Sequence, residues 1–367
     1  MQIIQKFYIA IVILFSYSLQ AYAEQASNIK VSFDIASAQA VCKVLTLRKA
    51  DTLQLQQISK LYGNTLLIRK VKGYSGAGED VFKKTLKEII ETGTVKDQDP
   101  YNWKLVKANL PAIQKLLTYL SSNQEQFITE VQTMISSYTP LTLTATTKAC
   151  FLVGGGSLGF TIGDDPTFNV ALQKIGDDVE GLKYLVAHEL YHNIQDAGQQ
   201  TRKKATTEKP PYFIKASYAL LYNLWAEGTA NFVGDFEKIK NPKSFSSEQQ
   251  LAFKKNADRQ YANFYLFETL IYRQYTDSTA RYQPLYDIAY STAFDESSYY
   301  VGYEMAKKIN QYNGNSAIAA LATQDPMVFV QTYIALYKSH PEDKSFKPFS
   351  SSVEQLIEKL LIWKDRI

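Results

Sequence analysis

The residues best suited to chemistry stand together at His188-Glu189-Leu190-Tyr191-His192, an H-E-x-x-H motif inside an apolar helical pattern. Residues four apart lie on one face of an α-helix, so both imidazoles can reach a single metal ion. Glu189 is turned by about 100° from His188, which places its carboxylate beside a metal-bound water. Zinc lowers the pKa of such a water, and the carboxylate can then take its proton as the water attacks a carbonyl.

The alternative is that two helical histidines fall four apart by chance. The chain has only 3 His, and random placement gives this spacing, with Glu after the first, at a frequency on the order of 10⁻³. Leu182, Leu185, Val186 and Leu190 indicate a helix buried in a core, where unpaired imidazoles would be costly. We therefore interpret the motif as a metal site.

A zinc hydrolase site needs a third protein ligand and one open position. No histidine near the motif supplies it, because the positions three and six after His192 hold Gln195 and Gly198. His340 lies near the C-terminus in a polar segment. The third ligand is therefore expected to be a carboxylate on a later helix, and the candidate is Glu227.

Glu227 stands among apolar and small residues, in Leu224-Trp225-Ala226-Glu227-Gly228-Thr229-Ala230-Asn231-Phe232. A carboxylate in such surroundings needs a strong partner, and Gly228 and Ala230 let the helix approach another element closely. Asn231, one turn further on, could hydrogen-bond a ligand histidine. The alternative is a solvated glutamate on a helix surface, because most single Glu residues are exposed.

H-E-x-x-H followed by W-x-E-G-x-A resembles the gluzincin class of zinc metallopeptidases and, more narrowly, a family of exported proteins regarded as zinc-dependent peptidases. The resemblance covers most of the mature chain in layout, but only the motif blocks are specific. It implies that His188, His192 and Glu227 hold the zinc and that Glu189 is the base. Many gluzincins carry Asp one turn after the ligand Glu, where this chain has Asn231.

A third block, Tyr299-Tyr300-Val301-Gly302-Tyr303-Glu304-Met305-Ala306, is similar to a Y-x-x-G-x-x-M-A segment in related proteins. A Tyr hydroxyl can donate to the oxyanion that forms when water adds to a peptide carbonyl, and Tyr299 matches the first position. Tyr300 and Tyr303 remain rivals. With 26 Tyr in the chain, a packed aromatic helix start is an equal alternative.

The elements that must position these residues are mainly helical, over about residues 37–138 and again from Tyr212 onward, with residues 70–80 predicted as a loop. Between them, the segments 141–153, 157–162 and 167–172 favour short strands, and Asp177-Asp178 begin the motif helix. We expect an α+β, predominantly helical, zincin-like fold. A small antiparallel sheet would pack on the motif helix beside a helical C-terminal lobe.

The predicted organisation is a signal peptide (1–23), a helical N-terminal region (24–140), the small sheet with the motif helix (141–200), and a helical lobe (201–367) that carries Glu227. In zincins a strand edge beside the motif helix binds substrate in extended form. The strand at 167–172 is the best candidate for that edge.

The N-terminus predicts export. Lys6 precedes a mostly apolar run, 7–19, and Ala21-Tyr22-Ala23 precede Glu24, which matches a secretory signal peptide with its cleavage site. An uncleaved anchor is the alternative, but the run is short and interrupted. We expect a periplasmic or secreted protein that starts at Glu24 and has no stable membrane span.

Composition excludes several classes of protein. With 46% hydrophobic and 21% charged residues, the chain is globular rather than disordered, and a net charge of +4 is too small for a dedicated nucleic-acid binder. No Lys-Ser/Thr follows Gly154-Gly155-Gly156, so a phosphate loop is not expected. Cys42 and Cys150 permit one disulfide or two buried thiols, and exclude a Cys-based metal site.

The leading hypothesis is therefore an exported peptidase that uses Zn²⁺ and acts on a peptide or protein substrate. The alternative is a zincin-like domain that binds a peptide or protein partner without turnover. Glu189 favours the enzyme, because a metal site kept only for structure would not need a general base. Hydrolysis of a non-peptide amide would use the same residues.

Overall fold

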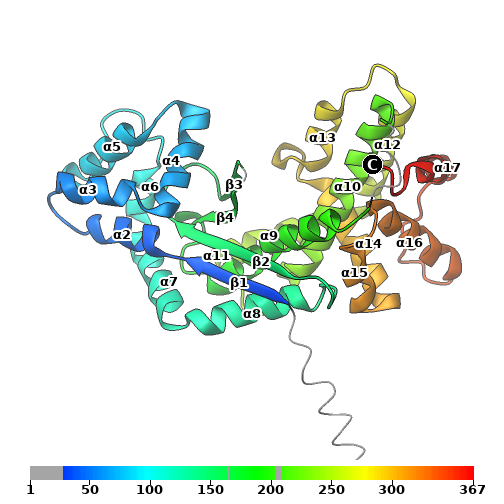
Figure 1. Ribbon diagram of the computed structural model, residues 1–367, viewed down its shortest axis with the longest axis horizontal. Helices are drawn as coiled ribbons and strands as arrows, with labels where there is room; N and C mark the ends of the chain where they lie inside the picture. The colour runs from blue at the N-terminus through cyan, green and yellow to red at the C-terminus, as the bar shows by residue number, and fades with distance from the viewer. Residues whose placement is uncertain (1–27, 164, 204–208) are drawn as a thin grey trace, which may run out of the picture.

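A computed structural model describes residues 28–163, 165–203 and 209–367, so the signal peptide predicted at 1–23 lies outside the described residues. Figure 1 shows two groups of helices on either side of one small sheet, with the long helix α9 (Val179–Gln200) running between them. The α+β, predominantly helical class is confirmed. Within the described ranges, no helix combines the length and the apolar character that crossing a bilayer requires.

The helices before the motif form the N-terminal group. They are α2 (Ala36–Val44), α3 (Thr52–Ser59), α4 (Tyr62–Ser75), α5 (Glu79–Thr92), α6 (Trp103–Ala108), α7 (Leu110–Ser122) and α8 (Gln124–Ser136). The loop predicted for 70–80 is wrong over its first half, because α4 continues to Ser75 and ends at Gly76, whose φ is 76°. An internal glycine such as Gly73 costs a helix only about 1 kcal/mol, and buried Leu67 and Val71 hold α4 against the core.

The sheet is mixed, which corrects the antiparallel arrangement predicted from the sequence. Its strands, in the order β1-β2-β4-β3, are β1 (Ile29–Asp34), β2 (Ala145–Leu152), β4 (Asp165–Ala171) and β3 (Gly159–Ile162). β2 pairs in parallel with both β1 and β4, and only β3 and β4 are antiparallel. β1 comes from the region predicted to be helical. Its partner lies more than a hundred residues away, and no local turn signal announces a parallel pair.

The strand predicted to bind substrate is not at an edge. β4 is hydrogen-bonded on one side to β2, where Phe168 pairs with Ala149, and on the other to β3, where Asn169 pairs with Phe160. The prediction that 167–172 forms the edge is therefore wrong. The outer strand on this side of the sheet is β3.

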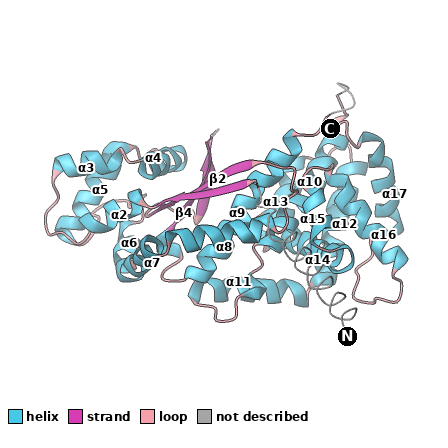
Figure 2. Cartoon of the chain, turned by 60° about the horizontal axis from the view of Figure 1, so that its bottom comes forward, coloured by secondary structure: helices cyan, strands magenta, loops and turns pink. Residues whose placement is uncertain are grey.

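Helices cover both faces of the sheet, whose strands stand out in magenta in Figure 2. α8 and α9 contact β1 and β2 on one face, while α2 and α4 contact β2 on the other. The Asn193 amide on α9 donates to the Thr147 hydroxyl of β2 at 2.6 Å and to the Pro166 carbonyl at 3.1 Å. The Tyr191 hydroxyl donates to the Tyr138 carbonyl, just after α8, at 2.9 Å. The motif helix is thereby fastened to the sheet and to α8.

The helices after the motif form the C-terminal group. They are α10 (Tyr212–Val233), α11 (Ser244–Asp258), α12 (Gln260–Thr276), α13 (Tyr282–Tyr290), α14 (Ser297–Asn313), α15 (Asn315–Leu321), α16 (Pro326–Ser339) and α17 (Ser351–Leu360). α10 packs against both α9 and α14. It therefore connects the motif helix to the rest of this group.

Of the two states left open for the cysteines, the structure has the thiols. Cys42 and Cys150 are both free and buried. Burial raises the pKa of each thiol to about 12, so neither is a reactive thiolate near neutral pH.

Candidate functional site

The start of α9 is tied to the C-terminal group by one buried carboxylate. Asp178 caps the helix by accepting the Gly181 backbone N–H at 2.8 Å. Its other oxygen accepts the Ser246 backbone N–H at 2.8 Å and the Ser246 hydroxyl at 2.6 Å, on α11. An N-cap of this kind stabilises a helix by about 1 kcal/mol. Here it also fixes the position of α9 against α11.

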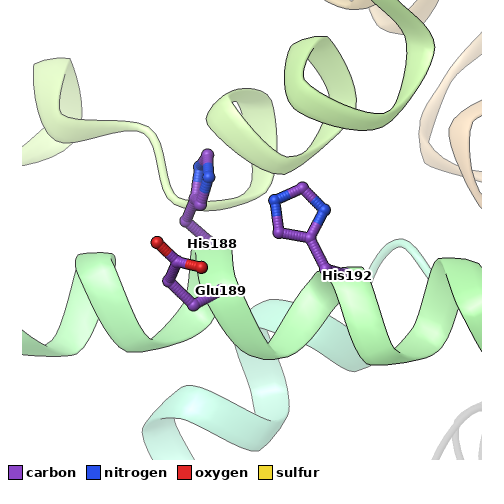
Figure 3. Close-up of side chains that lie close together, drawn as sticks. All are labelled: His188, Glu189 and His192. Atoms are coloured by element: carbon purple, nitrogen blue, oxygen red, sulfur yellow. The ribbon is translucent and has the colours of Figure 1, made fainter. Parts of the chain in front are cut away.

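The motif residues lie as their spacing predicts. Figure 3 shows both imidazoles rising from the same side of α9, with the Glu189 carboxylate beside His188. The two rings are 5.0 Å apart between centroids and nearly perpendicular, at 85°. One potential ligand atom from each of His188, Glu189 and His192 lies within 4.8 Å of the others. The three side chains can therefore face one ion or one ion-bound water.

Glu227, on α10, lies close to both histidines of α9. Its Oε2 is 3.2 Å from Nε2 of His192 and 3.6 Å from Nε2 of His188, and its side chain is 17% exposed. That oxygen is buried and accepts no hydrogen bond of good geometry from the described residues. A buried carboxylate oxygen aimed between two imidazole nitrogens calls for a cation. Two imidazoles and one carboxylate are a donor set that zinc takes.

The charges of this cluster are strongly coupled. Burial alone would lower the pKa of His192, but the Glu227 carboxylate outweighs it and raises that pKa to about 10. Burial would raise the pKa of Glu227, yet the two histidines hold it well below its usual value. Without metal, His192 is therefore an imidazolium paired with Glu227, and a metal ion must displace its proton.

The pKa values of Glu189 and Glu227 are shifted in opposite directions. Burial raises the pKa of the Glu189 carboxyl, the two histidines oppose that shift, and the charge of Glu227 adds to it. A carboxylate with a raised pKa is a better proton acceptor near neutral pH. The two carboxyl groups are thus suited to different tasks.

Close packing of glycines brings α14 next to Glu227. A Cβ on Gly228 would lie 2.4 Å from the Gly302 Cα, and a Cβ on Gly302 would lie 2.2 Å from the Leu224 carbonyl oxygen. The backbones of α10 and α14 therefore touch at the residue after Glu227. This close approach is the one expected of Gly228, and it places the start of α14 beside the cluster.

Of the three tyrosines proposed on α14, only Tyr299 is free to act there. Tyr300 and Tyr303 are buried, and the Tyr303 hydroxyl donates to a Glu237 carboxylate oxygen at 2.8 Å. Tyr299 is half-buried, and within the described residues its hydroxyl has no hydrogen-bond partner. Burial, together with the negative charge of Glu227, raises the pKa of Tyr299. Tyr299 is therefore a protonated donor close to the cluster.

A row of tyrosines on α13 that leads to Tyr299 was not predicted from the sequence. Tyr282, Tyr286 and Tyr290 lie in sequence along α13, with ring centroids 5.6 and 5.2 Å apart, and Tyr299 continues the row 6.1 Å from Tyr290. The Tyr286 hydroxyl has no hydrogen-bond partner among the described residues, and burial followed by the charge of Glu227 raises its pKa. The four-residue spacing is the signal that could have identified the row.

The residue that orients a histidine is also not the one expected. Asn231 makes no side-chain hydrogen bond in the part of the chain that the structure describes. Instead, the Gln195 side-chain oxygen is 2.7 Å from Nδ1 of His192. In the sequence, Gln195 stands out only because it occupies the position three residues after His192 where a third histidine is absent.

Comparison with known proteins gives one match. Residues 55–342, which hold the motif, Glu227 and the tyrosines of α13 and α14, match the model of a family described as "Putative zinc dependent peptidase (DUF5700)". No curated protein and no solved structure matches the chain. The matched stretch covers well over half of the chain and its H-E-x-x-H side chains converge as a metal site requires, so this chain belongs to that zinc-dependent peptidase family.

Proposed function

We propose that this protein is an exported peptidase that hydrolyses peptide bonds with a zinc-activated water. The observation that carries the proposal is the meeting of Glu227 Oε2 with Nε2 of both His188 and His192, with Glu189 beside them. Three protein ligands leave a fourth position open, which is the arrangement of catalytic zinc sites. The second carboxylate, Glu189, supplies the base that a purely structural site lacks.

Each residue would have a distinct role. His188, His192 and Glu227 would hold the metal, and a bound zinc ion would supply an acidified water and a polarised substrate carbonyl. Glu189 would accept the water's proton and pass it to the nitrogen of the leaving amine. The Tyr299 hydroxyl would donate a hydrogen bond to the oxyanion of the tetrahedral intermediate.

The outer strand β3 is the element suited to hold the substrate. On its inner side it pairs with β4, and no other described strand pairs with its outer side. An extended peptide could add to this edge through main-chain hydrogen bonds, which bind without much selectivity for side chains.

Metal removal tests the proposed function directly. The purified chain should contain one zinc ion and cleave members of a broad peptide library. A chelator should abolish cleavage, and stoichiometric zinc should restore it, because the acidified water depends on the metal. Metal analysis and mass spectrometry of the library products measure both. A zinc-loaded protein that binds a peptide and never cleaves one would instead support the binding domain.

Tyr299→Phe should lower kcat by roughly 10²-fold with little change in KM, because the lost donor acts on the oxyanion rather than on bound substrate. Tyr303→Phe is the matched control, since its hydroxyl is already bonded to Glu237. It should leave kcat nearly unchanged. The same loss in Tyr286→Phe, with Tyr299→Phe fully active, would transfer the role to α13.

Export is proposed from Lys6, the apolar run and Ala21-Tyr22-Ala23. N-terminal sequencing of protein from the native host should find Glu24 as the first residue, in the periplasm or the medium. An intact residue 1 in the membrane fraction would refute cleavage.

A further inference from the structure

The Gln195 side chain stands between the two helices that carry the proposed ligands. It is 1% exposed, and its Oε1 is 2.7 Å from Nδ1 of His192, three residues earlier on α9. Its Nε2 donates to the Ala226 carbonyl at 2.8 Å and to the Thr229 hydroxyl oxygen at 2.8 Å, both on α10. Buried amides of this kind are costly unless their donors and acceptors are satisfied, and here both ends are used.

The donor and the acceptor of each hydrogen bond around Gln195 can be deduced. The Thr229 hydroxyl is 2.9 Å from the Trp225 carbonyl, which can only accept, so the hydroxyl proton points there. The Thr229 oxygen must then accept from Gln195. The Ala226 carbonyl also only accepts, so both amide hydrogens of Gln195 are committed to α10.

The orientation of the Gln195 amide determines which ring nitrogen of His192 carries a hydrogen. With both hydrogens of Gln195 turned toward α10, only its oxygen can face His192, and an amide oxygen only accepts. His192 must therefore carry a hydrogen on Nδ1. A neutral ring with Nδ1–H has its lone pair on Nε2, which is the nitrogen 3.2 Å from Glu227 Oε2.

The same amide spans the two sides of the metal cluster. Ala226 and Thr229 flank Glu227 on α10, while His192 is on α9. Fixing the distance from Gln195 to α10 therefore also fixes how far Glu227 stands from the histidines. Asn231, the amide one turn after Glu227, makes no side-chain hydrogen bond within the described residues.

We infer that Gln195 is a positioning residue, which presents Nε2 of His192 to the metal and, through Ala226 and Thr229, holds Glu227 at ligand distance. The inference rests on the zinc site of the proposed function and not on peptide hydrolysis. Loss of a group that orients a metal ligand typically weakens metal affinity by roughly 10–100-fold.

Variants of Gln195 and Thr229 test this role through the zinc dissociation constant, measured by competition with a chromogenic chelator. Gln195→Leu should weaken zinc binding by roughly 10–100-fold. Thr229→Val, which touches no proposed ligand, should also weaken it, because one amide hydrogen loses its acceptor. Thr229→Ser keeps the hydroxyl and should bind zinc like the wild type. In the Gln195→Leu background, Thr229→Val should have no further effect.

If Gln195 served only to stabilise the fold, its loss would not change the exchange of the hydrogen on Nδ1 of His192. Since the chain has only 3 His, ¹⁵N-histidine NMR of the zinc-loaded protein can follow each imidazole. The Nδ1–H of His192 should be protected from exchange in the wild type and in Thr229→Ser. It should exchange rapidly in Gln195→Leu and in Thr229→Val.

Asn193→Leu is the matched control, because Asn193 is another amide of α9 but donates to Thr147 and Pro166 at the sheet. It should lower the unfolding midpoint and leave the zinc affinity within about twofold. Zinc binding by Gln195→Leu as tight as in the wild type, or no weaker than in Asn193→Leu, would overturn the inference. If Gln195→Leu does not fold, equal zinc affinities of Thr229→Val and Thr229→Ser would overturn it instead.

Failure of this inference can be told apart from failure of the proposed function. A wild-type protein that binds zinc and cleaves nothing would refute the peptidase, while the zinc affinities of these variants would still decide the role of Gln195. A wild-type protein that binds no zinc would overturn both.

Discussion

Glu189→Gln should retain its zinc and its fold and lose peptide hydrolysis by roughly 10²-fold or more, the loss expected when a general base is removed. The amide has nearly the shape of the acid, so the packing of α9 is preserved. It cannot accept the proton of the attacking water, so the step assigned to Glu189 fails. The zinc stays because its proposed ligands are His188, His192 and Glu227.

Zinc content and cleavage must be measured on the same preparation, because the two carboxylates are otherwise hard to separate. A Glu189 oxygen also lies within 4.8 Å of a ligand atom of each histidine. Loss of zinc from Glu189→Gln would therefore show that Glu189 is a ligand. Glu180→Gln, the same change in the first turn of α9 where Glu180 is paired with Lys183, should leave zinc and cleavage unchanged.

This substitution also separates the enzyme from the binding domain. Equal cleavage by wild type and Glu189→Gln would contradict the role of the base. If neither protein cleaves any member of a broad library and both bind one peptide equally, the binding domain is the better description. Burial raises the pKa of Glu189, which suits a general base. This favours the enzyme, because a buried carboxylate without a catalytic role would only destabilise the fold.

What could be predicted from the sequence was local. The motif helix, its Asp178 cap and most of the later helices follow from apolar spacing and capping residues within one segment. β1 could not be placed, because its pairing with β2 joins segments more than a hundred residues apart without a hairpin turn. For the same reason the sequence does not reveal that β4 is an inner strand, because its parallel pairing with β2 leaves no trace in its own residues.

In the candidate site, too, local features could be predicted and contacts between helices could not. Glu227 was found because a single carboxylate among apolar and small residues needs a partner. The orienting amide was expected at Asn231, one turn after Glu227, whereas the structure has Gln195, three residues after His192. Positions three and four apart share a helix face, so both were geometrically open. The choice depends on how α9 and α10 cross, which local patterns do not encode.

Glu227→Ala should release the zinc, with a loss of affinity greater than the roughly 100-fold that removal of an orienting group can cause. Two imidazoles from one helix would remain as ligands, one fewer than catalytic zinc sites use. Metal analysis after dialysis and chelator competition would measure the loss. Glu237→Ala is a control on a nearby carboxylate that lies outside the cluster and should keep full zinc. Full occupancy in Glu227→Ala would show that another carboxylate, with Glu189 the nearest, is the third ligand.

The pH dependence of zinc binding distinguishes a lost ligand from a general disturbance of the site. In the wild type, Glu227 raises the pKa of His192 to about 10, so below that pH zinc must displace a proton. Zinc affinity should therefore rise by roughly tenfold per pH unit from neutral pH toward 10. Glu227→Ala removes the largest influence that raises the pKa of His192, and burial then lowers this pKa against the smaller opposing effects of Glu189 and Gln195. The residual affinity of this variant should accordingly depend on pH less steeply than that of the wild type over that range. A variant that binds weakly but keeps the steep pH slope would mean that some other anion, and not Glu227, holds the proton on His192.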